Sequence, residues 1–182
     1  MSKVAHLPLR GAEETDEALA VRARGGDQLA FATLYRRHVR FVAGLTYRAL
    51  GSDLELDDVV QQVFIEAARG VVKMEEVETF RGWLYVVAVR QIHRVLVGRW
   101  RRRRMSLILP RFSNPDDAQP ISELARALEQ LPPEERLPWI LHEVEGETLP
   151  ETARACEVSL ATVKRRIARA EQFLSRRFER AE

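Results

Sequence analysis

The stretch from Thr148 to Phe173 restricts the fold of this chain more than any other, because it contains two helix starts in close succession. Thr148 is followed three residues later by Glu151, the spacing of a capping box, and Ser159 is a residue type preferred at a helix N-cap. Two short helices separated by so tight a break can only pack as a helix-turn-helix. We therefore expect this motif near the C-terminus.

The second helix of the motif has two different faces. Its apolar residues recur at helical spacing and form the face expected to be buried: Val163, Ile167, Ala170 and Leu174. The opposite face consists of Ala161, Arg165, Ala168, Arg169 and Gln172. Between residues 159 and 170 the helix bears only basic charges, whereas a helix built for solubility mixes both signs. An anionic partner is the favoured interpretation, and a helix pair with merely solvated arginines is the alternative.

The positions of these side chains suggest how nucleic acid would be bound. Lys164 and Arg166 lie on the flanks of the outer face, where they could hold phosphates. Thr162, Arg165 and Arg169 lie near its crest and could reach base edges in a major groove.

The composition places the chain among ordinary globular proteins. Its 182 residues, 46% of them hydrophobic, can form one domain or two small ones. The net charge of +2 is mild, so a nucleic-acid role would depend on how charge is distributed along the chain. The lone cysteine, Cys156, is expected to be a small buried hydrophobe in a reducing compartment. Without a signal core or an apolar run of about twenty residues, a cytoplasmic protein with no membrane insertion is expected.

The first part of the chain predicts a flexible leader followed by helices. Residues 1–15 have no periodicity, and helices are expected from Asp16 to Arg24 and from the Gly25-Gly26 break to Gly51. His38 lies on the apolar stripe of the second helix. Because no second ligand stands one turn away, a polar group packed between helices is favoured over a metal ligand.

An acidic entry then opens a third helix, for which Ser52 is the expected cap. The polar side chains expected to stay outside this helix are Asp57, Asp58, Gln61 and Gln62. One interpretation of Asp57 and Asp58 is that they only stabilise the helix, because carboxylates in a first turn interact favourably with the helix dipole. The other interpretation is that they form a docking face for a basic partner. A catalytic pair is disfavoured, because adjacent helical positions diverge by about 100°.

A strongly basic segment follows a predicted loop at residues 70–79. From Phe80 a helix is expected whose outer side presents Val86, Val89, Arg90 and His93. Its other candidate nucleic-acid contacts are Trp83, Arg94, Arg99, Trp100 and Arg101, and Tyr85 adds a further aromatic ring. Arginines beside aromatic rings suit unpaired bases, although core packing is an equal alternative for Trp83. So many uncompensated arginines indicate an anionic partner.

A proline-containing linker at 105–120 separates the two parts, so we expect one domain at 16–104 and a second at 121–182. Pro138 should kink a helix of the second domain, and Gly146 should end it. The sequence thus predicts an all-α protein made of two small helical domains.

Four segments in this order resemble one family, the extracytoplasmic-function (ECF, or group IV) sigma factors of bacterial RNA polymerase. They are AFATLYRRHVRFV, LDDVVQQVFIEAARG, FRGWLYVVAV and LEQLPPEERLPWILHEVEGETLPETARACEVSLATVKRRIARAEQFL. The resemblance spans about residues 27–177. It implies a region 2 and a region 4 that bind core polymerase and promoter DNA and direct initiation.

The resemblance also implies roles for individual residues. Asp57, Asp58, Gln61 and Gln62 would face the polymerase clamp. The loop at 71–79 and the basic helix after it, with Trp83 and Arg90, would handle the melted strand of the −10 element. Thr162, Lys164, Arg165 and Arg169 would read the −35 element, with Arg166 on phosphate, and the linker would thread toward the polymerase active-site cleft. An anti-sigma protein is a further partner that the family allows, and the hypothesis is that Val86 and Val89 contact either this protein or polymerase.

Four positions depart from the family pattern. Arg90 stands where an asparagine is usual, and Arg94 where an aspartate or asparagine is common. Glu157 replaces the usual turn glycine, at a cost of about 1 kcal/mol if its backbone is left-handed. Pro138 lies in a helix that is normally unbroken.

The favoured function is therefore a DNA-binding initiation subunit with no active site, cofactor or small-molecule substrate of its own. A conventional helix-turn-helix regulator is the alternative, and it would have no need of the acidic helix. A nuclease is disfavoured, because no metal-ligand spacing and no nucleophile with an adjacent base is present.

Overall fold

The computed structural model describes residues 14–73, 79–106 and 123–179, and within these ranges every regular element is helical. The first half of the chain contains α1 (Asp16–Arg24), α2 (Gln28–Leu50), α3 (Leu56–Val71) and α4 (Phe80–Ser106). The second half contains α5 (Glu123–Gln130), α6 (Pro133–Trp139), the π-helix η2 (Ile140–Val144), α7 (Leu149–Ala155) and α8 (Leu160–Phe178). The predicted all-α class is confirmed. Residues 1–13 of the predicted leader and most of the predicted linker lie outside the described residues, whereas Thr15, the last residue of the predicted leader, caps α1.

The starts and ends of the first helices follow from local side-chain chemistry. Asp27 accepts hydrogen bonds from the backbone N–H groups of residues 29 and 30 and so caps α2. Gly51, with φ of 69°, ends α2 in the left-handed region. His38 is buried between helices, its Nε2 atom 2.5 Å from Oδ2 of Asp16. The prediction of a polar group packed at a helix interface is confirmed.

The predicted start of α3 is wrong. Ser52 does not cap this helix, which begins after Glu55 with no side-chain capping bond. Instead the Ser52 hydroxyl accepts a hydrogen bond of 2.8 Å from Nη2 of Arg99. Glu55 forms an ion pair with the same guanidinium. Arg99, which is distant in sequence, therefore binds the hydroxyl oxygen of Ser52 that the sequence predicts to cap α3.

Two predicted boundaries also shift. Helix α3 continues through Val71, so the loop expected from residue 70 begins later, and residues 74–78 of it lie outside the described ranges. Helix α4 continues through Ser106, two residues into the predicted linker.

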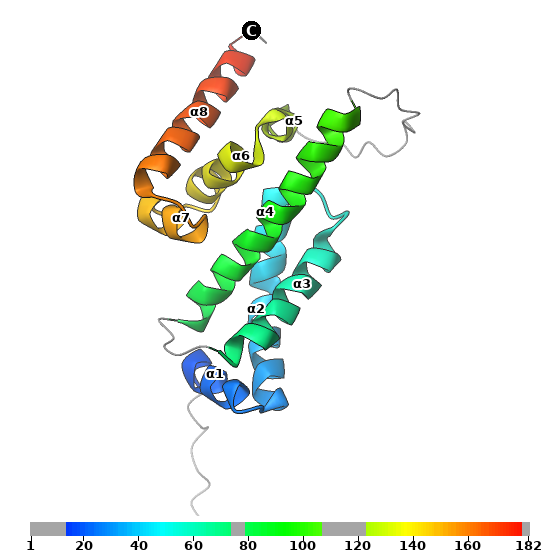
Figure 1. Ribbon diagram of the computed structural model, residues 1–182, viewed down its shortest axis with the longest axis vertical. Helices are drawn as coiled ribbons and strands as arrows, with labels where there is room; N and C mark the ends of the chain where they lie inside the picture. Colours follow the sequence, from blue (N-terminus) through cyan, green and yellow to red (C-terminus); the bar gives the residue numbers. More distant parts are fainter. Residues whose placement is uncertain (1–13, 74–78, 107–122, 180–182) are drawn as a thin grey trace, which may run out of the picture.

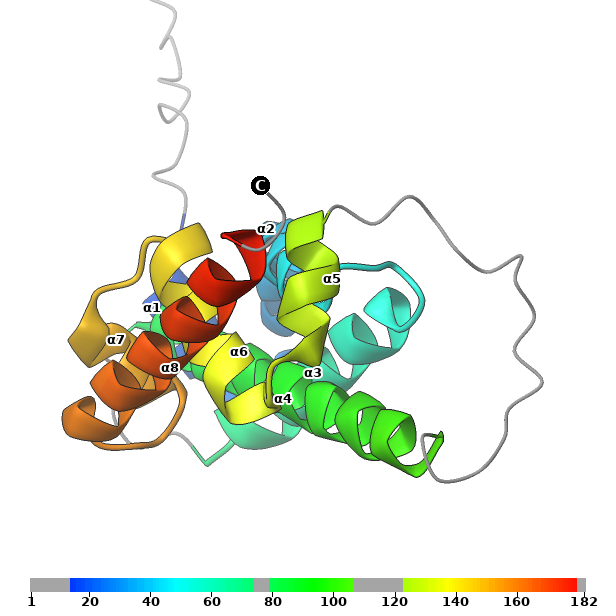
Figure 2. The same cartoon turned by 90° about the horizontal axis from the view of Figure 1, so that it is seen from above.

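Helix α4 lies between the other helices of the first half and the second half (Figure 1). Figure 1 also shows α3 on one side of α4 and α6 on the other, and in the view from above α6 again lies beside α4 (Figure 2). Both neighbours make direct contact with α4, as does α7. The two halves therefore form one packed body around this helix.

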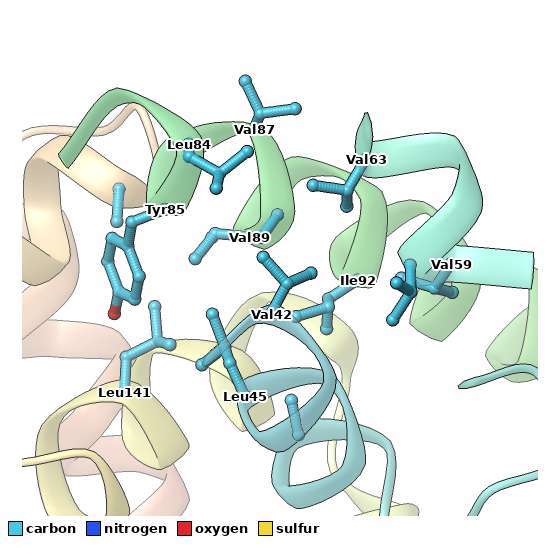
Figure 3. Packing of buried hydrophobic residues seen from close by; sticks show 14 of the residues in the cluster. Val42, Leu45, Val59, Val63, Leu84, Tyr85, Val87, Val89, Ile92 and Leu141 are labelled. Atoms are coloured by element: carbon cyan, nitrogen blue, oxygen red, sulfur yellow. The ribbon is translucent and has the colours of Figure 1, made fainter. Parts of the chain in front are cut away.

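The buried residues reflect this arrangement, because one hydrophobic cluster runs through both halves. Val42 and Leu45 of α2 meet Ile92 of α4, while Tyr85 of α4 lies toward Leu141 of η2 (Figure 3). Val89 is 1% exposed in this cluster. The prediction that Val89 faces outward is wrong, because helical periodicity cannot show that the second half covers this side of α4. Val86 is likewise only partly exposed.

The helix around Pro138 is disturbed where the sequence predicts it. Pro138 has no N–H to donate, and the α-helical register of α6 ends one residue later at Trp139. The chain then continues in the wider π register, in which the N–H of Glu145 donates to the carbonyl of Ile140 at 3.0 Å. Gly146, with φ of 75°, follows directly.

Candidate nucleic-acid and polymerase interfaces

The helix-turn-helix predicted from the capping pattern is present as α7 and α8. The Thr148 N–H and hydroxyl both donate to Oε2 of Glu151, at 2.9 and 2.6 Å, and the Glu151 N–H donates back to the Thr148 hydroxyl. Ser159 accepts a hydrogen bond of 3.2 Å from the N–H of Thr162 and caps α8. Both helix starts are thus fixed by local bonds, as predicted.

The turn between these helices contains a strained residue. Glu157 has φ of 55°, and it is the one residue other than glycine in the described part of the chain with a positive φ. The N–H of Val158 donates to the carbonyl of Ala153 at 3.0 Å, which closes α7. Glu157 is therefore left-handed, the case for which a cost of about 1 kcal/mol is expected.

The two faces of α8 are separated as expected. Its buried residues are Val163, Ile167, Ala170 and Leu174. Lys164, Arg165 and Arg169 are exposed, and Thr162 is partly exposed. Arg169 forms an ion pair of 3.7 Å with Glu135 of α6, and 61% of its side chain stays exposed. The basic crest of α8 therefore faces away from the protein body.

Arg166 differs from its neighbours on α8. It lines a cavity of about 320 Å³ between α4 and the second half, together with His93 and Cys156. Burial raises the pKa of the Cys156 thiol to about 11, so the thiol stays protonated near neutral pH. The expectation of a small, largely buried, unreactive side chain agrees with this environment.

The four polar residues assigned to α3 share one exposed surface. Asp57, Asp58, Gln61 and Gln62 are all exposed, and the opposite side of the helix is buried through Val59, Val60, Val63, Phe64 and Ala67. The two carboxylates lie in the first turn, where the helix dipole stabilises them. This acidic surface is therefore accessible to a basic partner.

The candidates on α4 fall into different environments. Trp83 packs against Phe80, with ring centroids 5.8 Å apart, and over Gly70, where an added Cβ would come within 2.6 Å of its ring. Arg94 forms an ion pair of 2.8 Å with Glu66 of α3. Arg101 is exposed at the far end of the helix.

Three other candidates on α4 are held by structural contacts. Arg99 donates to the carbonyl of Leu50 at 2.9 Å as well as to Ser52 and Glu55, so it joins α4 to the end of α2. Trp100 lines a small hollow with Arg136 of α6. Arg90 forms an ion pair with Glu157 in the turn of the second half.

Tyr85 corrects one expectation about the aromatic residues. It is buried, with its ring 6.2 Å from that of Phe41, and burial raises the pKa of its hydroxyl. Tyr85 is therefore a core residue and not a platform for a base.

Within the described ranges, no helix is both long enough and apolar enough to cross a bilayer. The same residues contain no group of three or more side chains placed to hold a metal ion.

Comparison with known families defines the class of protein. The family described as Sigma-70 region 2 matches residues 34–104, and the family described as Sigma-70, region 4 matches residues 121–174. The first match covers the acidic α3 and the basic α4, and the second covers the helix-turn-helix. Both surfaces thus belong to parts found in sigma factors.

Whole-chain relatives narrow this class. The ECF RNA polymerase sigma-E factor of Escherichia coli strain K12 is 31% identical, over 91% of this chain and 95% of its own. The ECF RNA polymerase sigma-E factor of Haemophilus influenzae is 29% identical, over 91% of this chain and 96% of its own length. The chain belongs to the ECF sigma factors, and it directs transcription initiation by RNA polymerase. The conventional regulator considered from the sequence is therefore excluded.

Solved structures support the same fold. CnrH, in complex with the cytosolic domain of CnrY, has a TM-score of 0.64 and 27% identity, over 92% of this chain and 99% of that one. The sigma factor RpoE of Bartonella quintana, in complex with the anti-sigma factor NepR, has a TM-score of 0.60 and 18% identity, over 82% of this chain and 96% of that one. The latter similarity concerns the fold alone.

Sequence reasoning missed the residues that join the two halves. Arg136 of α6 is 6% exposed, and its Nη2 atom donates to the carbonyls of Ala49 and Leu50 at 3.0 and 3.2 Å. Arg48 of α2 forms a two-pronged ion pair with Glu145, at 2.5 and 2.7 Å. These partners lie far apart in sequence, so no periodicity or spacing could have indicated them.

Proposed function

We propose that the first half, residues 16–104, acts as region 2 and the second, 121–182, as region 4, joined by a linker at 105–120. The observation that carries these assignments is the separation of charge in one chain. An exposed acidic surface lies on α3 and an exposed basic crest on α8. The catalytic chemistry then belongs to core polymerase, and this chain supplies promoter specificity beside it in the cytoplasm.

The acidic surface of α3 is proposed as the site for core polymerase. Asp57, Asp58, Gln61 and Gln62 offer carboxylate and amide groups on a rigid, exposed helix. A surface already accessible in the free chain needs no rearrangement to dock. Charge complementarity there would speed association with a basic partner.

The crest of α8 is proposed to read the −35 element. Arg165 and Arg169 can each reach base edges in a major groove, with Thr162 between them and the helix start. Lys164 and Arg166 would hold phosphates. The hydrogen bond of 3.5 Å from Arg165 to Thr162 is long, so reorganising it costs little.

The −10 element is proposed to lie along α4. Trp83, Arg90, Arg94, Arg99, Trp100 and Arg101 are the assigned contacts. Of these, Arg101 is exposed, whereas Arg99 is already held by Glu55 and the end of α2. Arg99 would therefore act mainly by fixing the orientation of α4. Arg101 would contact a phosphate of the promoter DNA.

An anti-sigma protein is a proposed third partner, in addition to core polymerase and promoter DNA. The similarity to CnrH, whose structure contains the cytosolic domain of CnrY, supports this assignment. Because Val89 is buried between the halves, its proposed role in such a contact requires the halves to separate first.

Run-off transcription with purified core polymerase tests these roles. Asp58→Arg should abolish association with core polymerase, whereas Glu17→Arg, an equal charge change at an exposed position on α1, should leave it intact. Arg165→Ala should weaken binding of a matched promoter by about 1–3 kcal/mol if the side chain contacts a base. Equal losses on all promoter sequences would instead assign Arg165 to the backbone, and unchanged activity of Asp58→Arg would refute the α3 assignment.

A further inference from the structure

The cavity of about 320 Å³ between α4 and the second half has an apolar floor. Val89 of α4, Leu137 of α6 and Ala155 of α7 line it and are buried, and Val97 of α4 lines it and is half-buried. Its volume lies at the lower end of the range for small-molecule sites, about 300–1,000 Å³. Such sites combine apolar walls with a few polar groups. We refer to this cavity as the α4–α8 cleft.

Charged side chains surround the opening of the α4–α8 cleft. They are Arg90 and His93 of α4, Glu134 of α6, Glu157 of the turn and Arg166 of α8. Arg90 and Glu157 form an ion pair, so their charges offset each other. Glu134 lies in the first turn of α6, where the helix dipole partly offsets its charge. Arg166 lies inside α8 and, within the described part of the chain, has no hydrogen-bond or ion-pair partner. Its guanidinium is therefore available to an anion.

Two neighbouring groups show that Arg166 makes the potential in the cleft positive. Burial is the main cause of the lowered pKa of His93, Arg166 lowers it further, and Glu134 opposes them with a smaller effect. Arg166 also lowers the pKa of the Cys156 thiol, although burial raises it by more. A charge that disfavours a protonated imidazole and favours a thiolate also favours other anions at the same place.

The remaining lining restricts the kind of anion. Glu134 and Glu157 would repel a ligand with several negative charges, such as a nucleotide. The floor formed by Val89, Leu137 and Ala155 offers no polar side chain, so the body of the ligand must be hydrocarbon. The volume holds about ten non-hydrogen atoms, if each occupies roughly the 30 Å³ of a water molecule.

We propose that the α4–α8 cleft binds a small organic monocarboxylate, with its carboxylate on Arg166 and its hydrocarbon body against the apolar floor. A guanidinium can donate two parallel hydrogen bonds to a carboxylate, which fixes the orientation of the ligand. The neutral imidazole of His93 carries one N–H that can donate a third. The site does not depend on the proposed function. A bound ligand would occupy the guanidinium that is otherwise proposed to hold a phosphate of promoter DNA.

Equilibrium dialysis of the full chain with radiolabelled octanoate, a straight-chain monocarboxylate of about this size, tests the site. We expect a Kd of about 0.1–1 mM, as for a ligand with so few atoms. Unlabelled acetate has the charge without the hydrocarbon body, and octan-1-ol has the body without the charge. Each should therefore displace octanoate at least about tenfold less effectively than unlabelled octanoate does.

Two variants change the cleft in different ways. Arg166→Met removes the guanidinium but keeps an unbranched side chain, and it should weaken octanoate binding about tenfold or more. Val97→Phe places a larger side chain in the cleft and should weaken binding about 3–10-fold. The matched control is Arg176→Met, at an exposed position of α8 that lines a different groove against α5, and it should leave octanoate binding unchanged. Circular dichroism verifies that every variant is folded.

Three results would overturn the proposal. Absence of octanoate binding at millimolar concentration, or the same Kd for the natural chain and folded Arg166→Met, would remove the assigned carboxylate site. Weaker binding by Arg176→Met in place of Arg166→Met would assign octanoate to the other groove. Equal displacement by octan-1-ol would show adsorption of hydrocarbon without recognition of charge. Run-off transcription tests the proposed function separately, so failure of either leaves the other in place.

Discussion

The left-handed turn residue between α7 and α8 permits a sharp test of backbone strain. Glu157 has φ of 55°, and a side chain in this region costs about 1–2 kcal/mol relative to glycine. Glycine also loses about 0.5–1 kcal/mol more backbone entropy on folding. We therefore expect Glu157→Gly to be about 1 kcal/mol more stable than Glu157→Ala. Both variants lose the Arg90 ion pair, so their difference reports the backbone alone.

The measurement is urea unfolding followed by circular dichroism, with the free energy of unfolding obtained by linear extrapolation. The matched control is Glu171, which is exposed inside α8. There the order should reverse, with glycine about 1 kcal/mol less stable than alanine, because that backbone is helical. An alanine variant at position 157 that equals or exceeds the glycine variant would refute the argument.

Two further predictions concern α4. Gly70→Ala should destabilise the fold by about 1–3 kcal/mol and alter the fluorescence of Trp83, because the new methyl group meets the ring of Trp83. The control is Gly98→Ala, whose methyl group meets only the flexible end of an arginine and which should be neutral or stabilising; equal unfolding midpoints for the two variants would contradict the prediction. Partial burial and the neighbouring Arg166 lower the pKa of His93 below 6.5. The folded state then binds fewer protons than the unfolded state, so stability should fall as pH drops through about 6.5, and His93→Gln should remove that slope in pH-dependent urea titrations.

Much of the site was predictable because it depends on local chemistry. The capping box at Thr148 and Glu151, the cap at Ser159 and the buried stripe of α8 all involve residues within one or two helical turns. The exposed acids of α3 follow from the same periodicity. Short-range hydrogen bonds and helical spacing are visible in the sequence itself.

The errors share one physical cause. Ser52 was expected to cap α3 but accepts a bond from Arg99, and Val89 was expected to face outward but is buried by the second half. Tyr85 was grouped with the arginines but packs in the core. Each outcome was decided by a partner distant in sequence, which periodicity within one helix cannot reveal.

The sequence by itself determined the helices, their caps and the distribution of charge between α3, α4 and α8, because these depend on neighbours along the chain. Only the tertiary structure decided which side of α4 is free. Packing of the second half against that helix, through Arg136, Glu145 and Glu157, joins residues whose separation in sequence leaves no local trace. Burial is a property of the assembled fold, and it places Val89, which periodicity predicts to face outward, in a contact between the two halves.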